Sequence, residues 1–296
     1  MAIFNLGSIN IDHVYRVAHL PGAGETVPAL GYASGLGGKG VNQSLAAAAA
    51  GARVHHIGAV GADGGRIVEW LTAGIDVADL TVVEGATGQG IVCVDAGGEN
   101  QIIIHSGANR ALTVAQIDRA LARARPGDWF LAQNETNLID EGFARARALG
   151  LRTAYAAAPF EAAAAAGLIG PGPARLVDLL AVNEVEAGQL AAHLGTAADA
   201  LPVPELLVTL GARGARYRAG ETVCEVAAFA VTPVDTTGAG DTFLGSFLAA
   251  RDGGAEPKAA LRQAAAAAAL QVTRPGAADA IPGSDEVAAF LAERGG

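Results

Sequence analysis

The stretch of the sequence most suited to chemistry is an aspartate that follows a turn of small residues, in Asp235-Thr-Thr-Gly-Ala-Gly-Asp-Thr-Phe243. Beyond this aspartate, apolar residues recur at the spacing of one helical face, namely Phe243, Leu244, Phe247 and Leu248. The pattern predicts a helix that begins near Asp241. Because free N–H groups at a helix N-terminus attract negative charge, the small residues of the turn are predicted to form an anion hole, namely Gly238, Ala239 and Gly240.

An anion hole beside a carboxylate is suited to phosphoryl transfer. A phosphoryl group in flight spreads charge over its oxygens, and a cluster of N–H donors stabilises that charge. Asp241 could accept the proton of an attacking hydroxyl, so it is the candidate catalytic base. The alternative is a glycine-rich turn in which the aspartate only caps a helix. The complete nine-residue segment with its helix favours the catalytic interpretation.

A second glycine-rich segment, Gly35-Leu-Gly-Gly-Lys-Gly-Val-Asn42, precedes an alanine-rich helix predicted over residues 41–50. Its glycines match a dinucleotide-binding spacing, but the segment does not directly follow the strand of a βαβ unit. A phosphate-binding P-loop also fails, because Ala33 replaces its first glycine and Gly40 its Ser or Thr. What remains is a glycine-lined loop that presents Lys39 and Asn42 to a polyhydroxylated ligand.

The elements that must hold these motifs alternate between strand and helix. Buried strands are predicted at residues 3–9, 54–60, 129–132, 153–156, 179–182 and 206–209. Such alternation indicates a parallel sheet with helices on both faces. Residues 12–35 and 88–107 break the rhythm, the latter as a hairpin with a glycine turn. They are predicted to form a small β lid on one α/β domain that spans residues 1–296.

Composition narrows the function classes. The formal net charge of −10 and the pI of about 5.0 argue against binding of nucleic acid or an anionic membrane surface. Cys93 and Cys224 each stand alone in an apolar setting and are expected to be buried free thiols in strands. The first residues lack the basic and apolar regions of a signal peptide, and no apolar stretch is long enough to span a bilayer. A cytoplasmic protein without membrane or nucleic-acid partners is expected.

The two glycine motifs resemble those of the ribokinase-like, or PfkB-type, carbohydrate kinases, and the resemblance covers nearly the whole chain. Residues 7–12 resemble the first strand of that family and its sugar-binding end. Residues 183–186 are similar to its N-x-x-E motif, linked with magnesium and phosphate, and 209–214 to its nucleotide-binding turn. Residues 105–109 and 272–277 resemble the ribokinase branch. The resemblance implies a three-layer sandwich with a mostly parallel central sheet and a small β-sheet lid.

The resemblance also implies a set of site residues. The implied sugar site has Asp241 at the reactive hydroxyl and comprises Asn10, Asp12, Gly38, Lys39, Asn42 and Glu135. ATP would lie across Asn183, Thr209, Gly211, Gly214 and Gly240. Mg²⁺ would be held chiefly by phosphate and water near Glu186. A monovalent cation such as K⁺ would be held by an aspartate and backbone carbonyls, for which Asp235, Thr237, Arg274 and Gly276 are the candidates.

Two residues depart from the family pattern. Ala280 stands where a serine hydroxyl would complete the monovalent-cation site, so activation by K⁺ stays an open question. Ala265 stands where a larger polar residue is often found near the adenine pocket. The nucleotide preference therefore also stays open.

The resemblance implies ATP-dependent phosphorylation of a small sugar, D-ribose to D-ribose 5-phosphate, with Asp241 as base. Other kinases of the family act on fructose, a keto-deoxy sugar acid or a nucleoside. A sugar acid would need extra cations, for which only Arg110 is an obvious candidate, and a nucleoside would need aromatic stacking from Tyr15 or Tyr32 in the lid. A non-catalytic sugar- or nucleotide-binding regulator is disfavoured by the intact Asp241 and its turn. Pairing of exposed lid edges would give a homodimer.

Overall fold

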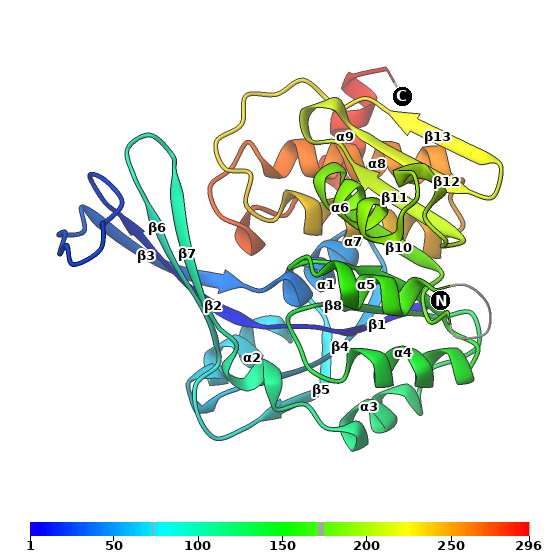
Figure 1. Cartoon of the computed structure of the whole chain (residues 1–296), viewed down its shortest axis with the longest axis horizontal. Coiled ribbons are helices and arrows are strands. Elements are labelled where there is room, and N and C mark those ends of the chain that lie inside the picture. Colours follow the sequence, from blue (N-terminus) through cyan, green and yellow to red (C-terminus); the bar gives the residue numbers. More distant parts are fainter. Residues whose placement is uncertain (73, 171–174, 296) are drawn as a thin grey trace.

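A computed structural model describes residues 1–72, 74–170 and 175–295 (Figure 1). Its main sheet has the strand order β13-β12-β11-β10-β9-β8-β1-β4-β5. The strands are β1 (Ala2–Leu6), β4 (Arg53–Val60), β5 (Asp76–Val82), β8 (Trp129–Gln133), β9 (Arg152–Ala156), β10 (Leu179–Asn183), β11 (Glu205–Thr209), β12 (Ala215–Ala219) and β13 (Thr222–Val226). Pairing is parallel from β5 to β11 and antiparallel at β12 and β13. The predicted mostly parallel central sheet is confirmed.

Helices cover both faces of this sheet, as a three-layer sandwich requires. One face packs against α1 (Lys39–Ala49), α2 (Gly65–Leu71), α7 (Ala239–Asp252) and α8 (Pro257–Gln271), and α9 (Ser284–Glu293) lies on α8. The other face packs against α3 (Val114–Leu121), α4 (Ile139–Ala148), α5 (Ala162–Ile169) and α6 (Glu184–Leu194). Successive strand residues serve opposite cores, as Ile3 and Phe4 do. No helix among the described residues has the length and apolar composition needed to cross a membrane.

Small residues bring α1 and α7 into close contact. A Cβ on Gly245 of α7 would lie 2.7 Å from the Cβ of Ala46 and 2.5 Å from the carbonyl oxygen of Gln43. The side chains of α1 that face α7 are short, because this part of α1 is rich in alanine. The two helix backbones can therefore approach closely. This packing sets the first turn of α7 beside the first turn of α1, which is where the two sequence motifs lie.

A second, four-stranded sheet projects from the main body (Figure 1) and has the order β3-β2-β6-β7. Its strands are β2 (Asn10–Arg16), β3 (Gly31–Gly37), β6 (Gly88–Val94) and β7 (Asn100–His105), with β2 and β6 parallel and the other pairs antiparallel. The glycine-lined loop expected within residues 35–42 was wrong in part, since β3 continues to Gly37, which pairs with Asn10, and α1 already begins at Lys39. Backbone pairing to β2 keeps this glycine-rich segment extended.

Candidate active site

Asp241 lies in the first turn of α7, opposite the first turn of α1. The Nδ2 of Asn42 donates to its Oδ2 at 3.3 Å, and the Nε2 of Gln43 donates to its Oδ1 at 2.8 Å. Burial raises the pKa of Asp241 to about 6, while the charge of Lys39 and the two amide donors act to lower it. A carboxylate with a pKa near the working pH, held at the end of a helix, is suited to accept a proton.

The turn before Asp241 lines a cavity of about 220 Å³. Gly238 precedes the helix with φ 75°, a left-handed conformation that favours glycine. The N–H of Ala239 donates to the carbonyl of Thr236 at 3.2 Å, so this donor is engaged within the turn. Lys39 and Gly240 face the same cavity. The cavity therefore joins a cation, a helix N-terminus and the Asp241 carboxylate.

Glu135 connects three segments beside this cavity. Its Oε2 accepts hydrogen bonds from the Oγ of Ser8 at 2.5 Å and from the backbone N–H of Lys39 at 2.9 Å. Ser8 in turn accepts from the N–H of Gly40 at 3.1 Å. The beginning of α1, the residues after β1 and the residues after β8 are thereby tied together. Sequence reasoning missed Ser8, because its partners lie far away along the chain.

Asp12 lies on β2, close to two glycines of neighbouring strands. A Cβ on Gly37 would lie 1.8 Å from Asp12 Oδ2, and a Cβ on Gly90 would lie 2.4 Å from Asp12 Oδ1. Burial raises the pKa of Asp12 to about 6, repulsion from Glu135 adds to the rise, and the charge of Lys39 opposes it. The carboxylates of Asp12 and Glu135 therefore lie in one electrostatic environment with Lys39.

Asn109 is a buried residue of the site that sequence reasoning did not select. Its Nδ2 donates to the Oδ1 of Asn10 at 2.8 Å, and its Oδ1 accepts from the N–H of Ile9 at 2.9 Å. Asn10, Asn109 and Glu135 line a second cavity of about 340 Å³. The only available signal was the family-like stretch at residues 105–109. Asn109 thus holds the backbone and side chain of the segment that ends at Asp12.

The residues predicted for the nucleotide fall into two groups. The first group lines the cavity of Asp241 and comprises Asn183, Glu186 and Thr209. Asn183 and Glu186 also form a reciprocal capping box at the start of α6. Asn183 Oδ1 accepts from the N–H of Glu186 at 2.9 Å, and Glu186 Oε2 accepts from the N–H of Asn183 at 2.8 Å. Gly211 and Gly214 lie in the turn after β11, outside this cavity lining. Gly214 has φ 108°, and a Cβ there would lie 2.0 Å from the carbonyl oxygen of Val226.

The residues predicted for a monovalent cation are only partly brought together. Asp235 accepts from the N–H of Thr237 at 2.9 Å and from that of Gly276 at 3.0 Å. The side chain of Arg274 pairs with Glu286 at 2.5 Å, whereas the group expected at the cation is its backbone carbonyl. Ala280 is buried at 1% exposure, and its methyl side chain offers no oxygen ligand. Ala265, 5% exposed, packs in the apolar core on α8.

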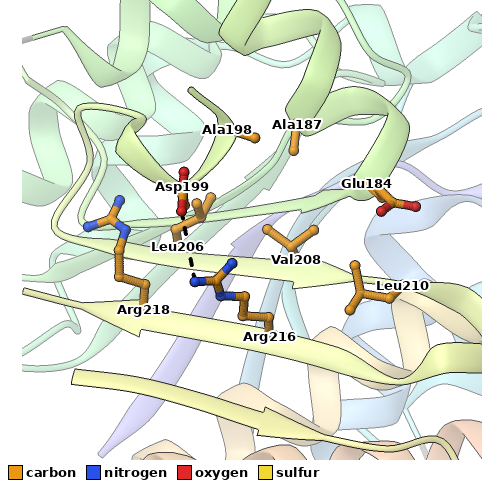
Figure 2. Close-up of a pocket in the computed structure, with 9 residues that line it drawn as sticks. All are labelled: Glu184, Ala187, Ala198, Asp199, Leu206, Val208, Leu210, Arg216 and Arg218. Atoms are coloured by element: carbon orange, nitrogen blue, oxygen red, sulfur yellow. Dashed lines mark ion pairs between the residues drawn. The ribbon is translucent and has the colours of Figure 1, made fainter. Parts of the chain in front are cut away.

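Another pocket, of about 140 Å³, lies against β11 and β12 (Figure 2), on the face of β11 opposite to the cavity of Asp241. Arg216 there lies 3.9 Å from Asp199 and 3.3 Å from Glu225. Arg218 donates to the backbone carbonyls of Leu201 and Val203 at 2.9 and 3.2 Å. Arg216 has acidic partners and Arg218 has carbonyl acceptors within the protein, and β11 separates both side chains from Asp241. This pocket is therefore not part of the candidate active site.

Comparisons with known proteins agree with this geometry. The chain is 34% identical over 302 residues to a ribokinase of Haemophilus influenzae, covering 97% of each chain. A ribokinase structure from Cryptococcus neoformans var. grubii serotype A, in complex with ADP, matches with TM-score 0.83 at 30% identity and covers 98% of this chain and 99% of that one. An Arabidopsis thaliana ribokinase complexed with ribose and ATP matches with TM-score 0.80 at 27% identity, with coverage of 98% and 99%.

Fold and relatives together define the class of this protein as a sugar kinase of the ribokinase fold. The model of the pfkB family carbohydrate kinases matches residues 2–283, nearly the whole chain. The chain belongs to the pfkB family of carbohydrate kinases. The expectation of a kinase is thereby confirmed, and the non-catalytic regulator is disfavoured.

Proposed function

We propose that this enzyme transfers the γ-phosphoryl group of ATP to D-ribose and forms D-ribose 5-phosphate. The observation that carries the proposal is the Asp241 carboxylate, held by Asn42 and Gln43 in the wall of a cavity that also contains Lys39. The names of the relatives support ribose as the acceptor and ATP as the donor. The sugar acid is less well supported, because its candidate cation Arg110 donates to the backbone carbonyl of Thr136 at 3.1 Å.

Sugar binding is assigned to the polar groups around Glu135. Carboxylates accept hydrogen bonds from adjacent sugar hydroxyls, while amide and ammonium groups can donate to them. Lys39 would donate to the sugar, and the Gly38 backbone would let the ligand approach closely. The proposed sugar-binding set is Asn10, Asp12, Gly38, Lys39, Asn42, Glu135 and Asp241.

In the reaction, a sugar hydroxyl attacks the γ-phosphorus in line and gives its proton to Asp241. The bond between the γ-phosphorus and the bridging oxygen breaks, and ADP leaves with that electron pair. The anion hole proposed at residues 238–240 would stabilise the charge on the transferring oxygens through N–H groups other than that of Ala239, which donates to the carbonyl of Thr236. The small sheet would cover the sugar and exclude water, which prevents ATP hydrolysis.

Nucleotide binding is assigned to the cavity side of the same turn, where Asn183, Thr209 and Gly240 line the cavity. The proposed contacts also include Gly211 and Gly214, in the turn after β11 and outside the cavity lining. The described residues contain no cluster of three acidic, histidine or cysteine side chains suited to a metal ion. A magnesium ion held mainly by phosphate and water suits such a site, with Glu186 reaching it through water. Bound Mg²⁺ would neutralise phosphate charge. K⁺ would use the Asp235 carboxylate with backbone carbonyls of Thr237, Arg274 and Gly276, and a hydrogen bond from the N–H of Gly276 to Asp235 holds two of these segments together.

The test of the proposed function is release of ADP from MgATP with a panel of acceptors, measured with and without K⁺. The panel contains D-ribose, 2-deoxy-D-ribose, fructose, a keto-deoxy sugar acid and a nucleoside. We expect the highest kcat/KM with D-ribose. Rapid turnover of another acceptor and none of ribose would overturn the substrate assignment. An unchanged rate without K⁺ would remove the cation site from the proposal.

A further inference from the structure

We propose that Gln43 is a positioning residue for Asp241, and that a buried chain of amide side chains fixes which end of Gln43 faces that carboxylate. The inference rests on the proposed role of Asp241 as the base. Gln43 is 2% exposed and lies on α1, immediately after the predicted sugar ligand Asn42. Its side chain points from α1 toward the first turn of α7. No family motif in the sequence selected it.

The chain of hydrogen bonds runs from Asp241 into the centre of the main sheet. Gln43 Nε2 donates to Asp241 Oδ1 at 2.8 Å, and Gln43 Oε1 accepts from Gln133 Nε2 at 2.7 Å. Gln133 Nε2 also donates to Asn5 Oδ1 at 2.9 Å. Gln133 and Asn5 are both 0% exposed, on the neighbouring strands β8 and β1. Two central strands therefore carry the support for one side chain of α1.

The direction of every bond in this chain is fixed by a backbone carbonyl. Asn5 Nδ2 donates to the carbonyl oxygen of Gly40 at 2.8 Å, and that oxygen can only accept. The other end of the Asn5 amide must therefore be the acceptor, so Gln133 donates to it. Gln133 then offers its second N–H to Gln43, which leaves the Gln43 N–H groups facing Asp241. Rotation of the Gln43 amide would set oxygen against carboxylate and N–H against N–H.

A second branch ends on another backbone carbonyl and agrees with this direction. His56 Nε2 lies 3.1 Å from the carbonyl oxygen of Gly7, which requires the ring proton to be on Nε2. Nδ1 of His56 then accepts from the Ser44 hydroxyl, 2.8 Å away. Ser44 Oγ accepts in turn from Asn5 Nδ2 at 2.8 Å. Burial lowers the pKa of His56 to about 4, so the ring stays neutral and this pattern persists at working pH.

Gln133 donates two hydrogen bonds through its Nε2, while its amide oxygen accepts none from the described part of the chain. Its Oε1 is buried and has no hydrogen-bond partner among the described residues. A buried unpaired acceptor is costly, so a role in stability alone is a poor explanation for this arrangement. Donation from Gln133 polarises the Gln43 amide, which makes it a better donor to Asp241. The chain thus supports the ionised, proton-accepting form of the base.

Burial, charged groups and hydrogen-bond donors all act on the pKa of Asp241, and their effects oppose one another. Lys39 and the amide donors Asn42 and Gln43 lower the pKa of Asp241, whereas Glu135 raises it together with burial. Gln43 is the donor nearest to Asp241, at 2.8 Å against 3.3 Å for Asn42. Loss of the Gln43 donor would remove one of the groups that lower the pKa of Asp241, while burial and Glu135 would still raise it. The pKa of Asp241 should then rise, and less base would be ionised at neutral pH.

The test is the pH dependence of kcat for Gln43→Met and Gln43→Glu with saturating sugar and MgATP. Met keeps the volume but removes the donor, so we expect the acid limb to move up by about one pH unit. Glu is nearly isosteric but places a second carboxylate beside Asp241, so we expect lower kcat at pH 7 than with Met. A role in packing alone would rank Glu above Met. An acid limb at the wild-type position in both variants would overturn the proposal.

Gln116→Met is the matched control. Gln116 is also a buried glutamine, 3% exposed, and its Nε2 donates to the carbonyls of Gly58 and Asp79 at 2.7 and 2.6 Å. It should lower Tm but leave the acid limb in place; an equal shift of the limb would overturn the proposal. Asp241→Asn in the same panel separates the two ideas. If it keeps wild-type turnover, the proposed base is wrong; if it loses turnover while Gln43→Met titrates normally, only the positioning role of Gln43 is wrong.

Discussion

Gly37 and Asp12 lie on paired strands so close together that a methyl group on Gly37 would fall 1.8 Å from Oδ2 of Asp12. The glycine therefore makes room for the carboxylate assigned to the sugar. We expect Gly37→Ala to displace Asp12 and raise the KM for the sugar at least about tenfold, since misplacement of about 1 Å can cost a hundredfold. Steady-state kinetics with varied sugar will measure this.

The matched control is Gly35→Ala on the same strand. A Cβ on Gly35 meets no atom within 4 Å, so this variant makes the same chemical change in open space. Its KM for the sugar should stay near the wild-type value. Equal KM values for the two variants would show that the Asp12 position does not depend on the glycine.

Asp241→Asn keeps the size of the side chain but removes the proton acceptor. We expect kcat to fall by roughly 10²–10⁴, the usual contribution of a positioned general base. The dissociation constant for the sugar, measured by calorimetry without nucleotide, should change much less. Turnover near the wild-type rate would contradict the assignment of Asp241 as the base.

Asp12 should also make stability depend on pH. Its pKa rises from 3.8 in the unfolded chain to about 6 in the fold, so the folded protein binds the proton more tightly. The resulting stabilisation is fully present below pH 3.8 and is lost as pH rises through 6. Asp12→Asn removes this loss. Calorimetry without ligands should show Tm above wild type by about 2 °C at pH 8 and a smaller difference at pH 4.

The opposite pH trend would mean that the neighbouring Lys39 outweighs burial at Asp12. Asp12→Asn should at the same time weaken sugar binding, because the amide offers one acceptor in place of two. A stabilised but less active variant would show that this carboxylate is kept for function at a cost in stability.

Short sequence patterns were enough to predict most of the buried strands of the main sheet. Strands of a parallel sheet are buried on both faces, so apolar runs such as residues 54–60 and 206–209 revealed them. Of the edge hairpin, only a strand at Cys224 was expected, and Cys224 does lie in β13 but is half-buried rather than buried. Strand β12 was not predicted, because Arg216 and Arg218 interrupt its apolar pattern. Strand β5 was also missed, since its seven residues include two aspartates, of which Asp79 is the buried residue of the strand.

The residues of the candidate site also fall into those that a local sequence pattern reveals and those that it does not. Asp241 could be found because a glycine turn and a helix start lie beside it in the sequence. Ser8, Gln133 and Asn109 could not, because their hydrogen bonds join residues about a hundred positions apart, as from Ser8 to Glu135 and from Asn109 to Asn10. A single sequence does not show which buried amide faces which carboxylate.

The capping box of α6 allows the two roles proposed for Asn183 to be separated. Asn183→Asp keeps an oxygen for the N–H of Glu186, so Tm should stay within about 1 °C of wild type. The new charge faces the cavity proposed for ATP, and we expect the KM for MgATP to rise about tenfold. Asn183→Ala should instead reduce the free energy of unfolding by about 1 kcal/mol. Kinetics of Asn183→Asp equal to wild type would leave Asn183 as a helix cap only.

We propose a homodimer through the small sheet, because strand β7 is exposed on both faces. The exposed fractions of Ile102, Ile103 and Ile104 are 54%, 65% and 51%, and β7 is an edge strand. Such an apolar edge is a natural pairing surface. Ile103→Lys should therefore convert a dimer to a monomer in light scattering at micromolar concentration. Val223→Lys, at an exposed position on edge strand β13, is the control and should leave the mass unchanged. A monomeric wild-type protein at that concentration would contradict the dimer.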